Sequence, residues 1–527
     1  MSSKSTTHPQ SKTNANFKKV LVANRGEIAL RIIRGVQQAG LKAVAIYSSA
    51  DQQSPHRFEA DEAYEITGET AGETYLNIDR VLAIASQSKS EAIHPGYGFL
   101  SENAIFAKRC QEAGLIFIGP EPRVIEAMGD KITAKHAMQN AQVPVLPGIT
   151  LDDDLSIEII AEEAEKIGYP VLVKAAAGGG GKGMRLVSKA DDLANAIESA
   201  RREATKAFGD GRVFLEKYIE KPRHVEIQVI GDTHGNLVHL FERECSIQRR
   251  HQKILEESPS IALSTSLRKA MGEAAIAAAK TIGYTNAGTV EFIVAPDGRF
   301  YFLEVNTRLQ VEHPVTELVT GIDLVQWQLQ VAQGEKLSKS QNQLSQRGHA
   351  IECRIYAEDP NNQFLPATGT LYWVQWPQGP NIRIDAGVTT GNEIGIHYDP
   401  MLAKLIVWGE TRPLAIETLR KALQETIILG VTTNIPFLLE LIQHPEFVNG
   451  NTHTHFLNEH SITLQQEPTN ALWAASAFAQ IPNSPLQHLF QGKNKHSKTL
   501  TNFSIQELAL NQASSFRHSG LVGTHTS

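Results

Sequence analysis

Short apolar runs alternate with amphipathic segments over the first 120 residues of the chain. We expect short buried strands at residues 17–23, 41–48 and 115–120. The segment between the first two carries one helical face, made of Ile28, Ile32, Ile33 and Val36. This alternation predicts a doubly wound parallel sheet. Residues 24–27 lack the G-x-G-x-x-G spacing of a dinucleotide site, so the pattern predicts a Rossmann-like domain with no sign of NAD.

A different pattern follows between Thr289 and His313, where polar and apolar residues alternate on both sides of a Pro-Asp-Gly turn. Side chains alternate faces along a strand. One face of the return strand should therefore carry Glu304, Asn306, Arg308, Gln310 and Glu312, and the opposite face should carry Val305, Leu309 and Val311. If Asp297 and Gly298 are the two central residues of the turn, Glu291 lies directly opposite Glu304.

Two facing carboxylates repel each other unless a cation lies between them. Mg²⁺ held by one or two carboxylates usually also holds the phosphates of a nucleotide. The pattern therefore predicts a metal–nucleotide site on Glu291 and Glu304. The alternative is a half-solvated edge strand whose polar face meets water.

The remaining pattern indicates further parts of a mixed α/β protein. We expect a helix over residues 123–140, two strands joined by a glycine-rich loop within 169–187, and a half-polar strand around 223–229. A block of short strands with a helix over 412–429 should fill residues 348–460. The first 16 residues and those beyond about 460 lose strong patterning, apart from a short helix expected at 470–479, and are predicted to be weakly structured tails.

Composition and charge exclude several classes of protein. The chain has 527 residues and a net charge of −7, which offers no basic excess for binding nucleic acid. No apolar stretch approaches the roughly 20 residues that span a bilayer. Three widely spaced cysteines are typical of a reducing cytoplasm and exclude a cysteine-based zinc site. We expect a cytoplasmic protein of several domains.

The glycine-rich loop is the second candidate for nucleotide chemistry. Gly178 to Gly181 allow backbone N–H groups to approach an anion, although the run is no Walker A motif. Lys174 before the loop and Lys131 on the preceding helix could reach phosphates, and the strand ending at Glu216 could offer backbone groups to an adenine ring. The alternatives are a flexible surface hairpin and, for His224, an ordinary edge-strand histidine.

Several long motifs resemble one known family. They include KVLVANRGEIALRI, EAIHPGYGFLSENA, MGDK, AAAGGGGKGM, RHVEIQV, ERECSIQRRHQK, FLEVNTRLQVEHPVTE, GHAIECRIYAEDP and HYDPMLAKLI. From about residue 17 to 460, the chain resembles the biotin carboxylase component of biotin-dependent carboxylases, a branch of the ATP-grasp superfamily. The resemblance implies a Rossmann-like N-terminal domain at 17–130, an ATP-grasp domain at 131–347 with a lid at about 150–218, and a β-rich C-terminal domain at 348–460.

The resemblance also implies roles for individual residues. ATP would be bound by Lys131, Lys174, Gly179, Gly180, Gly181, Glu216, Lys217, Ile219, His224, Gln248 and His251. Mg²⁺ (or Mn²⁺) would be held by Glu291, Glu304 and Asn306. Bicarbonate would be held by Lys253, Arg308, Gln310 and the backbone of Val311. Glu312 would act as the general base, kept ionised between Arg308 and Lys253, and Arg354 would bind the ureido oxygen of biotin.

The implied activity is ATP- and bicarbonate-dependent carboxylation of biotin through carboxyphosphate. No Met-Lys-Met motif for attaching biotin occurs in the chain, so we expect biotin on a separate biotin carboxyl carrier protein. The resemblance also implies a carboxyltransferase subunit, which is the second expected partner, and a homodimer. Two rivals remain open: another ATP-grasp ligase, and a non-catalytic nucleotide-binding assembly subunit.

Overall fold

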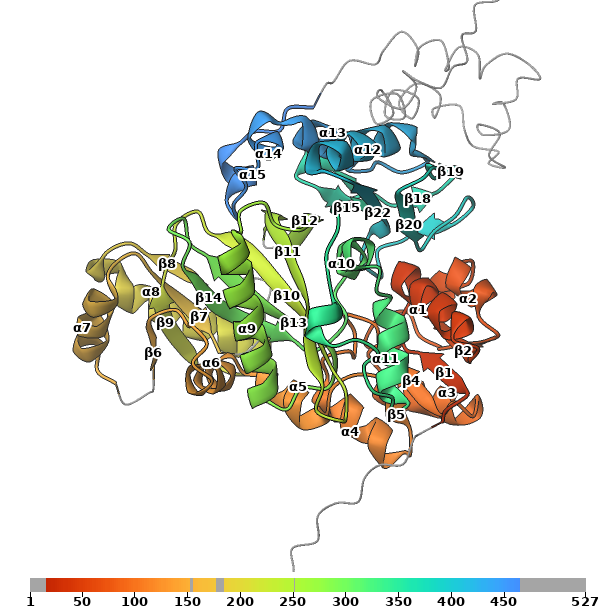
Figure 1. Ribbon diagram of the computed structural model, residues 1–527, viewed down its shortest axis with the longest axis horizontal. Coiled ribbons are helices and arrows are strands. Elements are labelled where there is room, and N and C mark those ends of the chain that lie inside the picture. Colours follow the sequence, from red (N-terminus) through yellow and green to blue (C-terminus); the bar gives the residue numbers. More distant parts are fainter. Residues whose placement is uncertain (1–15, 152–154, 177–183, 251, 465–527) are drawn as a thin grey trace, which may run out of the picture.

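The computed structural model describes residues 16–151, 155–176, 184–250 and 252–464. Both expected tails lie almost wholly outside the described residues, as do Gly179, Gly180, Gly181, His251 and the short helix expected at 470–479. Figure 1 shows the N-terminal elements at the lower right, the elements of residues 148–217 at the left and the C-terminal elements at the top.

The N-terminal domain is the expected parallel sheet. Its strand order is β3-β2-β1-β4-β5, and every neighbouring pair is parallel. The strands are β1 (Lys19–Val22), β2 (Lys42–Tyr47), β3 (Glu62–Glu65), β4 (Ala92–His94) and β5 (Ile116–Phe117), and the helices are α1 (Gly26–Gln38), α2 (Pro55–Glu59), α3 (Ile78–Gln87) and α4 (Ala104–Glu112). Helix α1 buries the face predicted from its apolar spacing, which confirms that prediction.

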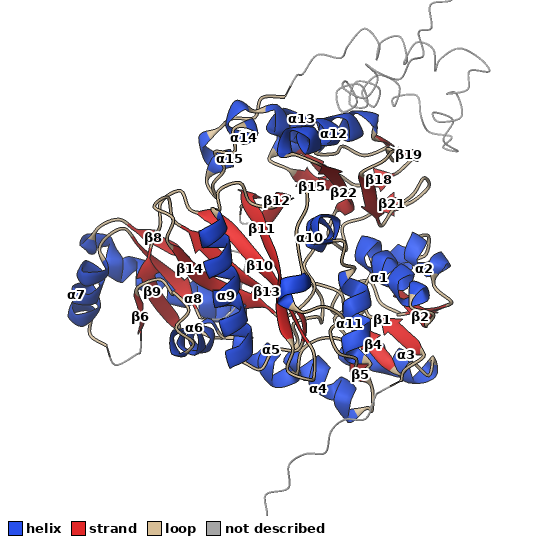
Figure 2. Ribbon diagram, viewed as in Figure 1, coloured by secondary structure: helices blue, strands red, loops and turns tan. Residues whose placement is uncertain are grey.

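A small antiparallel sheet of order β6-β9-β7-β8 forms a separate layer (Figure 2). Its strands are β6 (Gly148–Leu151), β7 (Val171–Ala175), β8 (Arg185–Val187) and β9 (Val213–Lys217), and its helices are α7 (Ile157–Ile167) and α8 (Leu193–Phe208). Apolar residues of α7 and α8 pack on this sheet, so it has a hydrophobic core of its own.

An eight-stranded antiparallel sheet links the middle of the chain to its C-terminal part. The strands, in spatial order, are β14 (Phe300–Asn306), β13 (Asn286–Val294), β10 (Arg223–Gly231), β11 (Leu237–Arg249), β12 (Gln252–Ser258), β15 (His349–Tyr356), β22 (Met401–Gly409) and β20 (Ile382–Ala386). Strand β12 pairs with β15, so one sheet contains strands from both the expected ATP-grasp domain (131–347) and the expected C-terminal domain (348–460). Helices α9 (Thr265–Thr281), α10 (His313–Thr320) and α11 (Leu324–Ala332) pack around it.

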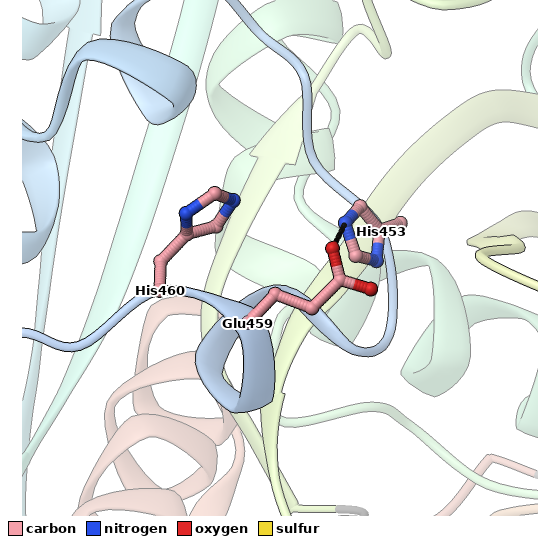
Figure 3. Close-up of side chains that lie close together, drawn as sticks. All are labelled: His453, Glu459 and His460. Atoms are coloured by element: carbon pink, nitrogen blue, oxygen red, sulfur yellow. Dashed lines mark ion pairs between the residues drawn. The ribbon is translucent and has the colours of Figure 1, made fainter.

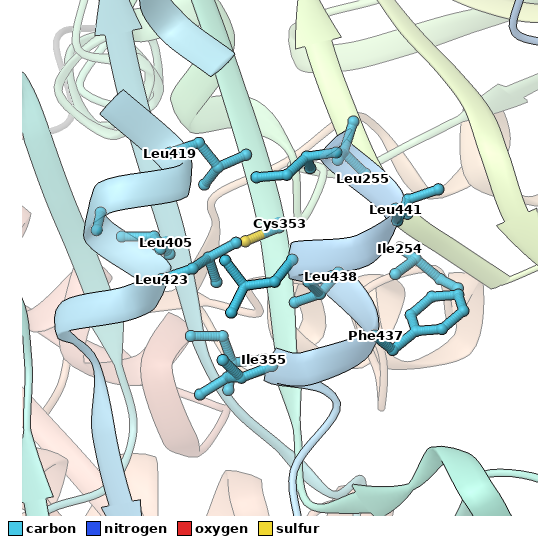
Figure 4. Close-up of a cluster of buried hydrophobic side chains, with 14 of the residues drawn as sticks. Ile254, Leu255, Cys353, Ile355, Leu405, Leu419, Leu423, Phe437, Leu438 and Leu441 are labelled. Carbon is cyan, nitrogen blue, oxygen red and sulfur yellow. The ribbon is translucent and has the colours of Figure 1, made fainter. Parts of the chain in front are cut away.

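Helices cover the far end of this sheet and close the largest apolar core. They are α12 (Arg412–Glu425), α13 (Ile435–Gln443), α14 (Pro445–Val448) and α15 (Phe456–Glu459). Figure 4 shows leucines of α12 and α13 meeting the sheet around Cys353. Short ribbons complete this part: β16 (Glu358–Asp359), β17 (Leu365–Pro366), β18 (Gly369–Thr370), β19 (Trp373–Gln375), β21 (Glu393–Ile394) and β23 (Ile427–Leu429).

Two expected helices are shorter than predicted. The helix expected over residues 123–140 is two helices, α5 (Pro122–Gly129) and α6 (Lys131–Asn140), because Asp130 adopts an extended conformation and caps α6 by accepting the Thr133 N–H at 2.7 Å. The helix expected over 412–429 ends at Glu425, and the β-branched residues after it form β23. Among the described helices, none has the length and apolar content required to cross a bilayer.

Candidate functional site

The hairpin of β13 and β14 places Glu291 opposite Glu304, as predicted. The turn, however, differs from the one assumed. Three residues, Pro296 to Gly298, lie between Ala295 and Arg299, whose backbone groups hydrogen-bond at 2.8 Å. A bulge at Leu303 then restores the register, since Phe292 pairs with Phe302 while Glu291 pairs with Glu304. The two irregularities offset each other.

The return strand is shorter than its alternating pattern indicated. β14 ends at Asn306, and residues 307–312 form an irregular loop that leads into α10, which has Pro314 in its first turn. Arg308, Gln310 and Glu312 therefore reach the site from this loop. Val311 was expected on the opposite face, yet it lines the same cavity, and its carbonyl accepts a hydrogen bond from Lys404 at 2.8 Å.

One cavity of about 730 Å³ lies between the small sheet, the long sheet and the C-terminal helices. Every described residue that the sequence proposed for the site lines it. These are Lys131, Lys174, Glu216, Lys217, Ile219, His224, Gln248, Lys253, Glu291, Glu304, Asn306, Arg308, Gln310, Val311, Glu312 and Arg354. The structure thus gathers residues that lie more than 200 positions apart in the chain.

Basic side chains from the small sheet and from α6 face one end of this cavity. Lys174 on β7 donates to Glu216 at 2.8 Å, and Lys131, the first residue of α6, lies 3.3 Å from Glu304. The ammonium group of Lys217 donates instead to the carbonyls of Gly168 and Tyr169, at 2.8 and 3.2 Å. The Lys217 ammonium group is therefore already occupied and does not offer its charge to the cavity.

The other end of the cavity holds a dense cluster of buried charges centred on Lys253. Its ammonium contacts Glu226 at 2.5 Å, Glu312 at 2.7 Å and Glu291 at 2.9 Å. Burial alone would lower the pKa of Lys253, but these three carboxylates outweigh it and raise the pKa well above its ordinary value. Lys253 is therefore a fixed positive charge at neutral pH.

Glu312 is held ionised, as predicted, although by a different pair of cations. It contacts Lys253 and, at 3.1 Å, Arg354. Burial raises the pKa of Glu312, but Lys253, Arg354 and Arg243 outweigh burial and hold the pKa well below the usual carboxyl range. Arg308, which was expected as the second cation, donates to Glu102 at 2.8 Å and to Gln310 at 2.7 Å.

Arg354 is anchored by a second acid, Glu256, which sequence reasoning did not single out. Its Nε donates to Glu256 at 2.7 Å, and Glu256 is fully buried. Burial raises the pKa of Glu256 to about 7, and the attraction of Arg354 opposes that rise. The pair fixes the guanidinium at the edge of the cavity.

The donor set for the expected metal consists of oxygens, the ligand type that Mg²⁺ prefers. Glu291 and Glu304 face each other across the hairpin, and Asn306 Nδ2 donates to Glu291 at 2.7 Å. Burial raises the pKa of Glu291, but Lys253 and His224 outweigh it and lower the pKa, so the carboxylate is charged. His224 Nε2 lies 2.7 Å from Glu291. These residues fit a hard divalent cation.

The structure adds residues that the sequence pattern could not reveal. The cavity also has an apolar section formed by Leu146, Leu172, Met184, Ile293 and Leu303, and a wall from the C-terminal end formed by Thr454, His455 and Asn458. Tyr218 stacks on His455, with ring centroids 6.1 Å apart, and the two side chains hydrogen-bond at 3.0 Å. An isolated sequence gives no signal that residues 454–458 meet residue 218.

The fold and site together define a nucleotide-binding enzyme of the ATP-grasp class. Residues 16–125 match the biotin carboxylase N-terminal domain, residues 130–340 the ATP-binding domain of the carbamoyl-phosphate synthase L chain, and residues 352–459 the biotin carboxylase C-terminal domain. The chain belongs to the biotin carboxylase family.

Individual relatives show how far the similarity extends. The chain is 52% identical to the biotin carboxylase of Halalkalibacterium halodurans over 84% of its own length and 98% of the relative. It is 53% identical to the alpha subunit of the mitochondrial methylcrotonoyl-CoA carboxylase of Dictyostelium discoideum, covering 89% of this chain and 70% of the relative. It spans only 64% and 62% of the corresponding rat and mouse proteins.

A solved structure of a biotin carboxylase domain is similar to this protein in fold and sequence. The biotin carboxylase domain dimer of Hydrogenobacter thermophilus 2-oxoglutarate carboxylase, in complex with MgADP, ADP and bicarbonate, superimposes with a TM-score of 0.81. Its sequence is 48% identical, and the match covers 84% of this chain and 98% of that one.

Proposed function

We propose that the protein carboxylates biotin at the expense of ATP and bicarbonate, as the first half-reaction of a biotin-dependent carboxylase. The observation that carries this proposal is one cavity that holds two opposed carboxylates, the lysines Lys131 and Lys174, and an ionised Glu312 between two fixed cations. Membership of the biotin carboxylase family and the similarity to a domain crystallised with MgADP and bicarbonate support it.

In the first step, an oxygen of bicarbonate attacks the γ-phosphorus of ATP, the bond to the β-phosphate oxygen breaks, and ADP leaves. Mg²⁺ on Glu291, Glu304 and Asn306 would neutralise charge that develops on the phosphates. Lys131 and Lys174 would add positive charge at the same end. Glu312 would accept the bicarbonate proton. A carboxylate whose pKa lies well below neutrality is a weak base, so this transfer depends on Lys253, Arg308 and Gln310 holding the bicarbonate in contact with it.

In the second step, carboxyphosphate breaks into CO₂ and phosphate, and the phosphate removes the proton from the ureido nitrogen of biotin. That nitrogen then bonds to the carbon of CO₂. Arg354 would stabilise the negative charge that collects on the ureido oxygen, because its guanidinium is permanently charged and held in place by Glu256. Arg308 and Gln310, joined at 2.7 Å, would hold the planar bicarbonate.

The wider assembly is part of the proposal. We propose biotin on a separate carrier protein, a carboxyltransferase partner, a homodimer and a cytoplasmic location, with the domain division at residues 17–130, 131–347 and 348–460. Two relatives are themselves named as single subunits, one of methylcrotonoyl-CoA carboxylase and one of pyruvate carboxylase, which supports a multi-subunit context. Co-purification from the native source, followed by identification of the bound proteins, tests the partners.

The decisive assay measures ADP release with and without bicarbonate and with added free biotin. We expect release that requires bicarbonate and that free biotin accelerates, together with transfer of labelled bicarbonate to biotin. Turnover that does not depend on bicarbonate would favour a different ATP-grasp ligase. An absence of turnover with tight nucleotide binding would favour a role in assembly only.

A further inference from the structure

A second group of potential metal ligands lies outside the chemistry described above, around helix α15. His453 precedes the helix, Glu459 is its last residue, and His460 follows directly (Figure 3). One ligand atom from each of the three lies within 4.8 Å of the other two. His453 Nε2 is 3.5 Å from Glu459 Oε2.

Two imidazoles and one carboxylate make a donor set that is common for zinc, with water in a fourth position. A tetrahedral ion with bonds of about 2.0–2.1 Å holds its ligand atoms roughly 3.3 Å apart. The His453–Glu459 separation is already close to that value. The partly exposed His460 ring packs against His444 and Phe456, with ring centroids 4.8 and 4.7 Å away, and has to rotate against them to complete the site. We propose that His453, Glu459 and His460 bind a divalent transition-metal ion, with zinc as the best fit.

The candidate ligands already have hydrogen-bond partners that a metal would have to displace or share. Two contacts compete with the metal. Lys221 donates to Glu459 Oε2 at 2.7 Å, and the His455 backbone N–H donates to His453 Nδ1 at 3.2 Å.

These two competing contacts determine how tightly the metal ion is expected to bind. Binding through His453 Nε2 moves its hydrogen to Nδ1, so the weak bond from the His455 N–H is lost. The positive charge of Lys221 also repels an incoming cation. Glu459 Oε2, the oxygen that lies 3.5 Å from His453 Nε2, is also the oxygen that accepts from Lys221, so the metal and Lys221 compete for it. We therefore expect a site that fills reversibly and whose affinity increases when the Lys221 charge is removed.

The proposed metal ligands lie next to one wall of the nucleotide cavity. Thr454, His455 and Asn458, which line that cavity, lie between the proposed ligands in the chain. The Thr454 N–H donates at 2.9 Å to the carbonyl of Pro222, the last residue of the connection between β9 and β10. A bound ion would therefore hold together the segment that forms one wall of the cavity.

The test is a Co²⁺ titration of the full chain, stripped with chelator and then supplied with excess MgADP to occupy the nucleotide cavity. We expect one equivalent of Co²⁺ with the visible absorption of a four-coordinate ion, displaced by Zn²⁺. His453→Ala and His460→Ala should each weaken binding at least about tenfold, the scale on which supporting interactions affect metal sites. His234→Ala, which removes an exposed histidine elsewhere, is the matched control and should change nothing.

Lys221→Met provides a test that does not depend on removing a ligand. Loss of its charge should tighten Co²⁺ binding by about threefold, since a like charge close to the ion is removed. The proposal is wrong if wild-type protein binds no more Co²⁺ than a His453→Ala, His460→Ala double variant. It is equally wrong if Lys221→Met weakens binding, or if Co²⁺ binding survives both histidine substitutions unchanged.

Discussion

Arg354 offers the sharpest separation between the two proposed half-reactions. It is 8% exposed and contacts two acids, Glu256 and Glu312, of which only Glu312 is proposed to act on bicarbonate. In Arg354→Ala, Glu312 keeps its 2.7 Å contact with Lys253 and remains charged. We therefore expect bicarbonate-dependent ADP release within about threefold of wild type. Transfer of the carboxyl group to biotin should fall about 10²–10³-fold, the cost of losing a donor to a developing oxyanion.

The structure also bounds the effect of this change on stability. Removing one partner of a buried ion pair ordinarily costs about 3–5 kcal/mol, because a bare charge is left behind. Here the stranded acid is Glu256, whose pKa is about 7. Without Arg354 that pKa rises further, so Glu256 binds a proton and carries no charge. What remains is a buried hydroxyl with incomplete hydrogen bonding, which costs about 1–3 kcal/mol.

Three measurements check this reasoning: ADP release, carboxylation of free biotin with labelled bicarbonate, and chemical unfolding. Adding Glu256→Gln to Arg354→Ala should change the unfolding free energy by less than about 1 kcal/mol, because the two sites interact and the acid is already neutral. Arg268→Ala is the matched control, since Arg268 pairs at 2.8 Å with another buried acid, Glu242, outside the cavity. Equal losses in both rates for Arg354→Ala would refute the assigned role.

Three further predictions address the metal, the base and the pH dependence. Glu304→Gln should raise the Mg²⁺ concentration for half-maximal ADP release by at least about tenfold, and an unchanged metal requirement would contradict the hairpin site. Glu312→Gln should lower bicarbonate-dependent turnover about 10²–10⁴-fold, the typical contribution of a general base, while the dissociation constant for ADP stays within about twofold; weaker ADP binding would mean that Glu312 has another role. The folded-state pKa of Glu256 is raised to about 7, so its stabilising effect is complete below the unfolded value near 4.5 and is lost as pH rises through 7. Unfolding free energies measured between pH 5 and 8 should therefore lose part of their downward slope in Glu256→Gln, and identical slopes would show that Glu256 does not titrate in this range.

The spacing of polar and apolar residues predicted those parts of the fold that depend on residues close together in the chain. The parallel N-terminal sheet and the buried face of α1 follow from the spacing of apolar residues, and both are confirmed. The pairing of Glu291 with Glu304 was also predicted, yet it holds only because a longer turn and a bulge at Leu303 cancel. The alternation of polar and apolar residues predicts neither the three-residue turn nor the bulge.

Long-range charge pairing could not be predicted in the same way. The sequence placed Glu312 between Lys253 and Arg308, but the loop after Asn306 turns Arg308 towards Glu102 and leaves Arg354, on β15, as the second cation. That choice depends on β12 pairing with β15, which brings together strands almost a hundred residues apart. No local pattern reports such a pairing.

The sharing of Lys253 among three carboxylates has a consequence for the order of binding. An anion such as bicarbonate has to compete with Glu226, Glu291 and Glu312 for one ammonium group. The competition weakens when another cation takes over Glu291, because Lys253 then has one carboxylate fewer to satisfy. Glu291 belongs to the proposed metal and nucleotide end of the cavity, so the two ligands are thermodynamically linked through this residue. Bicarbonate affinity should therefore rise with MgATP occupancy, and by reciprocity bicarbonate should tighten MgATP binding by the same factor.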